Sequence, residues 1–127
     1  MLEPNKKAIG IFGGSFDPPH KGHVKISKIS LKKIKLKKIY WIITKKNPFK
    51  KKTFFSIKKR IQMSKKALKR HKKIEVQYLD DKIKSSRMIK VINHMKTVKK
   101  QNDLYLILGS DNLRDFHKWT SWKKIVK

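Results

Sequence analysis

The segment GIFGGSFDPPHKGH, residues 10 to 23, is the most informative part of the sequence for predicting the fold. It overlaps a short apolar run, Ala8 to Phe12, which predicts a buried strand followed by a glycine turn. Gly13 and Gly14 carry no side chain, so the backbone after this strand can approach a ligand closely with its amides exposed. The stretch matches neither GxGxxG nor the GxxxxGK phosphate loop, which excludes those two nucleotide-binding motifs. It nevertheless predicts a phosphate site.

The prolines and histidines of this stretch predict a helix that begins beside the glycines. Pro18 and Pro19 delay helix entry to about His20 or Lys21, so the helix end with its unpaired amides points at the same spot. His20 and His23 are three residues apart, which places both rings on one side of the first turn. Imidazole can hydrogen-bond a phosphate oxygen as its charge grows, so both histidines are candidate catalytic residues.

Two plainer interpretations of the histidine pair are a polar helix start without chemistry and a pair of metal ligands. The chain has no cysteine, and no obvious third ligand accompanies the pair, so we expect no structural zinc site and assign no metal ligands. Together with the neighbouring glycines and prolines, the pair favours phosphate chemistry.

Strand and helix patterns alternate along the rest of the chain. Apolar, β-branched and aromatic runs predict strands at residues 8–12, 38–44, 74–79 and 103–108. Apolar spacing and serine caps predict helices at residues 21–35, 56–71 and 86–99, followed by short helices at 112–119 and 121–127. This alternation predicts an α/β fold, a parallel sheet covered by helices with ligands beyond the carboxyl ends of its strands.

Length and composition narrow the protein class. At 127 residues the chain has the length of one domain, and we expect residues 1–127 to form a single one. The absence of cysteine excludes disulfides and fits a reducing compartment. The opening residues, MLEPNKKAIGIF, contain no long apolar segment, and no membrane span is evident. We therefore expect a cytoplasmic protein without a membrane partner.

The formal net charge of +28 has two interpretations. A basic surface can gather nucleic acid or an anionic membrane through counterion release. However, almost all the positive charge is lysine spread over every segment, and arginine, which suits bidentate phosphate and base contacts, is scarce. Lysine and isoleucine enrichment is what an AT-rich genome encodes, so we favour compositional drift over nucleic-acid binding. The field should still draw in anionic nucleotides.

Four motifs together resemble a known family. GGSFDPPHKGH (13–23) resembles the HxGH signature of the nucleotidyltransferase superfamily, in the form found in bacterial nicotinate mononucleotide adenylyltransferases. Further along, the resemblance continues in WIITKKNPFK (41–50), GSDNLRDFHKW (109–119) and KWTSW (118–122). It covers essentially the whole chain. It implies a Rossmann-like nucleotidyltransferase fold with helices on both faces of the sheet and with its last part missing.

The resemblance also implies a reaction and a set of site residues. AMP passes from ATP to nicotinate mononucleotide, giving deamido-NAD and pyrophosphate, with Mg²⁺ bound to the ATP. The implied roles are as follows: His20 and His23 stabilise the ATP phosphates in the transition state; Gly13, Gly14, Ser15 and Phe16 lie against ATP; Lys50 supplies charge near the triphosphate or acceptor; Gly109 and Asp111 meet the ribose or nearby nucleotide atoms; and Trp119 stacks on the pyridine ring.

This chain departs from the family pattern in two places. Relatives continue past the position of Lys127 with another strand and a Ser-Thr-x-x-Arg type segment that contacts ATP, so we expect the carboxyl-terminal part of the domain to be absent. Relatives also carry Ser-Tyr-Thr near the pyridine carboxylate, where this chain has Ser86-Arg87-Met88. Met88 is therefore a candidate acceptor contact, and the change bears on acceptor preference.

Alternatives stay open at this point. Asp111 fits a helix cap as well as a ribose contact, and Trp119 fits the core, the role we expect for Trp122. For the whole chain, one alternative is a sister transferase acting on phosphopantetheine or nicotinamide mononucleotide. Another is a non-catalytic basic remnant that binds RNA or acidic surfaces.

Overall fold

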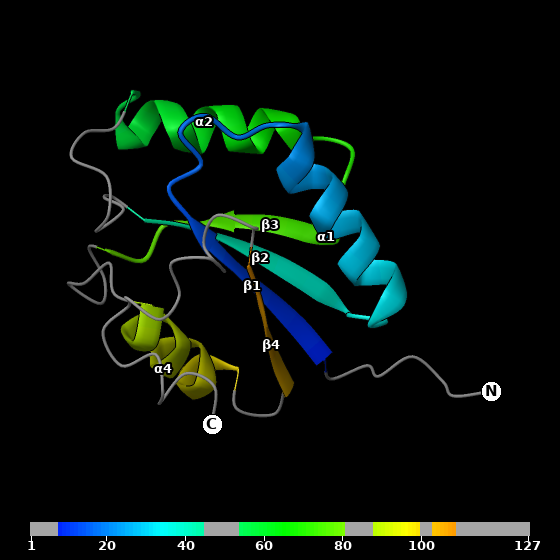
Figure 1. Cartoon of the computed structure of the whole chain (residues 1–127). Coiled ribbons are helices and arrows are strands. Elements are labelled where there is room, and N and C mark those ends of the chain that lie inside the picture. Colours follow the sequence, from blue (N-terminus) through cyan, green and yellow to red (C-terminus); the bar gives the residue numbers. More distant parts are fainter. Residues whose placement is uncertain (1–7, 45–53, 81–87, 100–102, 109–127) are drawn as a thin grey trace.

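A parallel sheet forms the centre of the protein (Figure 1). The computed structural model describes residues 8–44, 54–80, 88–99 and 103–108. Its four strands lie in the order β3-β2-β1-β4. Their bounds are β1 (Ala8–Gly14), β2 (Lys38–Ile43), β3 (Ile74–Gln77) and β4 (Asp103–Ile107). Every neighbouring pair is parallel, which confirms the predicted sheet.

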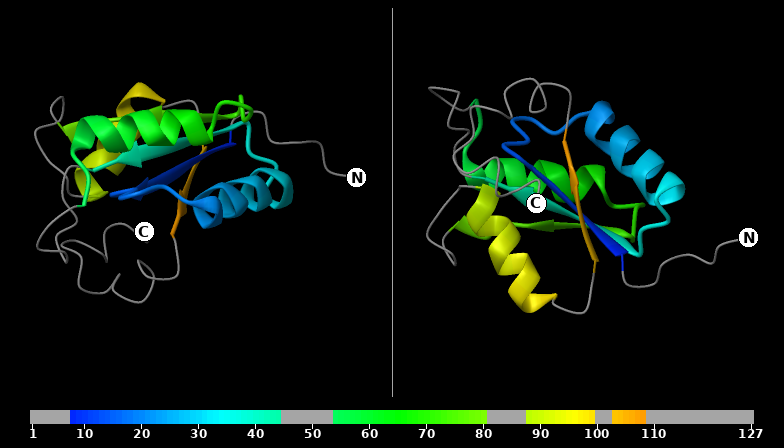
Figure 2. Two further views of the ribbon diagram at one scale, coloured as in Figure 1. Left: turned by 90° about the horizontal axis from the view of Figure 1, so that it is seen from above. Right: turned by 60° about the horizontal axis from the view of Figure 1, so that its bottom comes forward.

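Helices cover both faces of this sheet. Their bounds are α1 (Lys21–Lys33), α2 (Ile57–Ala67) and α4 (Met88–Val98). Figure 1 shows α1 and α2 over one face and α4 on the other, and the right-hand view of Figure 2 brings α4 in front of the sheet. The helices and strands predicted within these ranges are confirmed to within a few residues, whereas the predicted helices at 112–119 and 121–127 lie outside the described residues.

Alternation along the strands builds two separate cores. Phe12 and Trp41 belong to the cluster that packs against α1 and α2. Ile11 and Ile42, one residue away on the same strands, belong to the cluster that packs against α4. Because successive side chains of a strand point to opposite faces, each buried strand serves both layers. The strands are apolar at nearly every position because helices cover both faces of the sheet. Burial of each large apolar side chain stabilises the fold by about 1.5–3 kcal/mol.

The strand order places a topological switch at β1. The chain passes from β1 through α1 to β2 on one side, whereas β4 pairs with β1 on the other side after the chain has crossed to the opposite face. In open sheets of this kind, ligands bind at the carboxyl ends of the strands at such a switch. The segment that follows β1 is residues 15–20, which leads directly into α1.

Among the residues that the structure describes, no helix is long and apolar enough to cross a bilayer. The cytoplasmic location stays a prediction.

Candidate functional site

Gly13 and Gly14 lie inside β1, whereas the sequence analysis predicted that they follow the strand. Gly13 pairs with Ile42 and Gly14 with Ile43, so the ladder with β2 runs two residues further than predicted. The amide of Thr44 then donates to the carbonyl oxygen of Gly14 at 2.8 Å. Because β2 offers backbone partners over its whole length, pairing continues until Ser15, and the connecting loop is residues 15–20.

The two histidines cap α1 in a reciprocal arrangement. The amide of Gly22 donates to Nδ1 of His20 at 3.0 Å, and the amide of His20 donates to Nδ1 of His23 at 3.0 Å. His20 is the residue before the helix and His23 is the third residue within it, so the pair forms a capping box in which imidazoles take the usual places of Ser and Glu. The ring centroids are 3.9 Å apart. The predicted placement of both rings on one side of the first turn is confirmed.

These hydrogen bonds assign the proton on each ring. An imidazole nitrogen that accepts a hydrogen bond carries no proton, so in the neutral ring the proton is on the other nitrogen, Nε2. His20 is exposed, and its Nε2–H is therefore a donor directed away from the helix backbone. The first turn of α1 contains no acidic side chain, so the positive end of the helix dipole is not neutralised there. The arrangement suits an anion with several oxygen acceptors.

An aromatic cluster packs against the ring of His23. The ring of Phe16 is stacked on Trp41 at a centroid distance of 4.7 Å, and it lies 4.7 Å from the ring of His23. Phe16 is only 2% exposed, so a contact between this residue and ATP would have to come from its backbone. Its φ of 47° is unusual for a bulky residue, and the packing of its ring offsets the conformational cost of roughly 1–2 kcal/mol.

Arg60 is a buried residue of the site that the sequence prediction missed. It belongs to α2 and is 1% exposed. Its Nη1 donates to the carbonyl oxygens of Ser15 at 2.9 Å and Thr44 at 2.8 Å, and its Nε donates to that of Phe55 at 3.1 Å. Burial lowers the pKa of Arg60, and the nearby Asp17 carboxylate opposes that shift. An arginine among so many lysines was the available signal, because its rigid planar fork holds donors in fixed directions toward several carbonyls.

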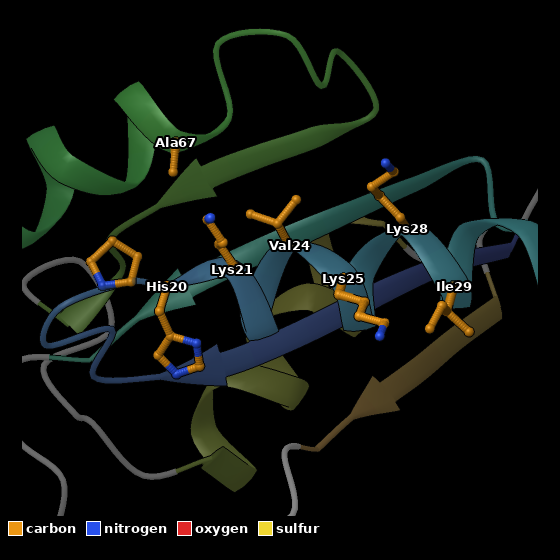
Figure 3. Close-up of a pocket in the computed structure, with 8 residues that line it drawn as sticks. His20, Lys21, Val24, Lys25, Lys28, Ile29 and Ala67 are labelled. Atoms are coloured by element: carbon orange, nitrogen blue, oxygen red, sulfur yellow. The ribbon is translucent and has the colours of Figure 1, made fainter.

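A groove begins at His20 and follows α1 (Figure 3). It combines basic and apolar side chains of α1 with one residue of α2, and it is lined by Pro19, His20, Lys21, Val24, Lys25, Lys28, Ile29 and Ala67. The lysines place positive charge next to the exposed imidazole, which favours the approach of anionic ligands.

The remaining predicted site residues fall outside what the structure describes. Lys50, Gly109, Asp111 and Trp119 lie beyond the described ranges, and Met88 begins α4 but its side chain is not described. Their roles stay predictions. The described part of the chain contains no group of three or more histidine, cysteine or acidic side chains that could hold a metal ion.

Comparison with known proteins identifies the family of the chain. The model of the cytidylyltransferase-like family matches residues 11–127. The probable nicotinate-nucleotide adenylyltransferase of Pelagibacter ubique is 45% identical over 126 residues, which cover 99% of this chain and 69% of that protein. A structure from Vibrio parahaemolyticus has a TM-score of 0.78 at 17% identity, covering 94% of this chain and 72% of that one, and it shows the shared fold.

A second solved structure carries a ligand. It is the nicotinic acid mononucleotide adenylyltransferase of Plasmodium falciparum complexed with NaAD, 26% identical with a TM-score of 0.74. The match covers 94% of this chain but 60% of the Plasmodium chain, so this chain spans less than two thirds of that protein. The chain belongs to the cytidylyltransferase-like family and, within it, to the nicotinate-nucleotide adenylyltransferases, a group of nucleotidyltransferase enzymes.

Proposed function

We propose that this chain transfers AMP from ATP to nicotinate mononucleotide, giving deamido-NAD and pyrophosphate in NAD biosynthesis. The observation that carries the proposal is the histidine cap. Both Nδ1 atoms are engaged by backbone amides, so the exposed His20 presents its Nε2–H as a donor for chemistry at the start of α1. The Pelagibacter relative and the NaAD complex of the Plasmodium enzyme support the choice of acceptor.

In this proposal the reaction is a direct displacement. A 5′-phosphate oxygen of nicotinate mononucleotide attacks the α-phosphorus of ATP, a new P–O bond forms, and the bond to pyrophosphate breaks. Negative charge moves onto the leaving oxygens, where the positive end of the α1 dipole and the exposed His20 donor stabilise it. No covalent enzyme intermediate is required, since positioning and charge neutralisation supply the catalysis.

In this proposal Mg²⁺ binds together with ATP. The described residues form no carboxylate cage, and the Asp17 carboxylate is already engaged by the amides of Phe54 and Phe55. Within the described residues a protein cage therefore does not fit, whereas Mg²⁺ is usually held mainly by substrate phosphates. When bound there, it neutralises triphosphate charge.

The test separates the chemical role of His20 from its capping role. Asparagine is among the best capping residues and can accept the Gly22 amide through its side-chain oxygen, but it lacks a group at the position of Nε2. We expect His20→Asn to melt near the wild-type temperature while losing about 10²–10³-fold in kcat, the typical effect of removing one preorganised donor. His71→Asn, the same change outside the described site, is the matched control and should leave both values unchanged.

The assay is pyrophosphate release from Mg²⁺-ATP with nicotinate mononucleotide, nicotinamide mononucleotide or phosphopantetheine as separate acceptors. Release only with nicotinate mononucleotide is the expected result. Release with another acceptor would reassign the chain to a sister transferase. No release with any acceptor by the folded wild-type chain would overturn the proposed activity. Salt-sensitive RNA binding without turnover would then favour the basic-remnant alternative.

A further inference from the structure

We propose that Arg60 is a positioning residue for the transferase reaction, holding the loop of residues 15–20 and, through it, the histidine cap in their working geometry. This inference rests on the proposed function for its kinetic consequence, but its structural part can be tested without turnover. Arg60 is 1% exposed, so it cannot meet a nucleotide directly in this structure. Any influence on the reaction must pass through the backbone that it binds.

The guanidinium joins the two connections that follow β1 and β2. Ser15 is the first residue after β1, Thr44 the first after β2, and Phe55 lies just before the cap of α2. Arg60 donates to the carbonyl oxygen of each at 2.8–3.1 Å. Ser15 and Thr44 are buried, so these carbonyls have little access to water. One side chain of α2 thus satisfies backbone groups in two connections, at Ser15 between β1 and α1 and at Thr44 and Phe55 between β2 and α2.

A second tether joins the same loop to the same segment. The Asp17 carboxylate accepts hydrogen bonds from the backbone amides of Phe54 and Phe55. Arg60 therefore holds the loop at Ser15 and Asp17 holds it two residues later, on either side of the strained Phe16. Three residues beyond Asp17 the loop reaches His20. The loop between Ser15 and His20 is short, and hydrogen bonds fix it at Ser15 and at Asp17.

Lysine at position 60 would keep the charge and lose the geometry. An ammonium is a compact point donor, whereas the guanidinium is a rigid fork whose nitrogens reach carbonyls in different directions. Arg60→Lys should therefore leave at least one of the three carbonyls without its donor. Because a misplacement of about 1 Å in a catalytic group can cost roughly 10²-fold in rate, a small shift of the loop suffices for a kinetic effect.

The experiment compares Arg60→Lys with Arg70→Lys, the same substitution at an exposed position just after α2. The whole chain is labelled with ¹⁵N, and long-range ¹H–¹⁵N spectra report the tautomer of each histidine. In the wild type, His20 and His23 should show the Nε2–H tautomer with an unprotonated Nδ1. In Arg60→Lys we expect a mixture of tautomers at both positions and a kcat lowered about 10- to 100-fold. Arg70→Lys should match the wild type in both.

Each outcome decides the proposal. Wild-type histidine signals and kcat in a folded Arg60→Lys variant would overturn it. If the wild type shows no turnover, the histidine signals alone decide, so failure of the proposed activity is distinguishable from failure of this inference. If Arg60→Lys does not fold, Asp17→Asn replaces it, because that change weakens the second tether without burying an unpaired group. Unchanged histidine signals in Asp17→Asn would then count against a loop held by these tethers.

Discussion

The indole Nε1 of Trp41 donates a hydrogen bond to Oγ of Ser27 at 2.8 Å, and Ser27 Oγ donates in turn to the carbonyl oxygen of His23 at 2.8 Å. Trp41 lies on β2 and Ser27 on α1, and both are fully buried. The strand thus holds the backbone of the turn that carries one catalytic candidate. Trp41 was predicted only as part of an apolar strand, and its polar contact explains why tryptophan fits there.

Ser27→Ala should destabilise the protein by about 1–3 kcal/mol, because the indole N–H of Trp41 would remain buried without an acceptor. Urea unfolding of the single variant, of Trp41→Phe and of the double variant measures the coupling. In the double variant the serine should matter less, since no indole remains to satisfy. Strictly additive losses would show that the hydrogen bond contributes nothing beyond packing.

Gly22→Ala should separate stability from activity. A Cβ at Gly22 would lie 2.8 Å from Cε1 and 2.9 Å from Nδ1 of the His20 ring, so the ring must move. The helix itself favours alanine over glycine by about 0.5–1 kcal/mol. We therefore expect a thermal midpoint that is equal or higher and a kcat that is clearly lower. Adding Gly22→Ala to His20→Asn should cause little further loss, and an equal loss in both backgrounds would place the effect elsewhere.

At position 16 a glycine variant should be more stable than an alanine variant, the reverse of the usual order. Both replacements remove the ring, but at a φ of 47° alanine keeps the clash of its Cβ with the backbone while glycine does not. Phe16→Gly should be more stable than Phe16→Ala by roughly 1 kcal/mol in urea unfolding. At Phe12, a strand residue whose φ is not positive, Phe12→Ala should be the more stable variant. The same order at both positions would rule out strain at Phe16.

The ion pair of Lys38 and Glu75 should make a small, pH-dependent contribution to the free energy of unfolding. Their atoms Nζ and Oε1 are 2.8 Å apart, and this hydrogen bond raises the pKa of Lys38 and lowers that of Glu75. For Glu75 the stabilisation is present above its unfolded pKa and is lost as pH falls through the lowered folded value. For Lys38 it is present below the unfolded pKa and is lost as pH rises through the raised folded value.

Because both side chains are substantially exposed, we expect Glu75→Gln to cost under about 1 kcal/mol near neutral pH. The difference from the wild type should shrink as pH falls below the ordinary glutamate pKa and vanish only below the lowered folded pKa of Glu75, where the carboxylate is protonated in both states. Thermal midpoints measured across this acid range check the prediction. A difference that persists at low pH would mean that Glu75 acts through packing.

Local patterns were sufficient to predict the fold within the described residues. The glycine and proline punctuation around His20 located the start of α1, and Ser56 was correctly predicted as the cap of α2. These features depend on residues adjacent in sequence, so they are visible without knowledge of tertiary contacts. The end of β1 was misplaced because the ladder of Gly13 and Gly14 with β2 is a non-local interaction.

The candidate site was predicted only where its chemistry is local. The histidine pair and the glycines were found from their spacing, whereas Arg60 reaches Ser15 across 45 positions and has no motif that announces it. The predicted position of Phe16 against ATP stays a prediction for its backbone, whereas its ring stacks on Trp41 in the core, a contact that the motif did not indicate. Such assignments require the packing of distant segments.

The side-chain hydrogen bonds that hold the histidine cap and the loop of residues 15–20 join residues between Ser15 and Arg60, within the first half of the chain. By contrast, β4, which completes the sheet beside β1, and α4, which covers its second face, come later. During synthesis the chain emerges from its amino-terminal end and segments can fold in that order. A ribosome therefore makes every residue that holds the histidine cap before it makes the strand that will pair with β1 on its other side.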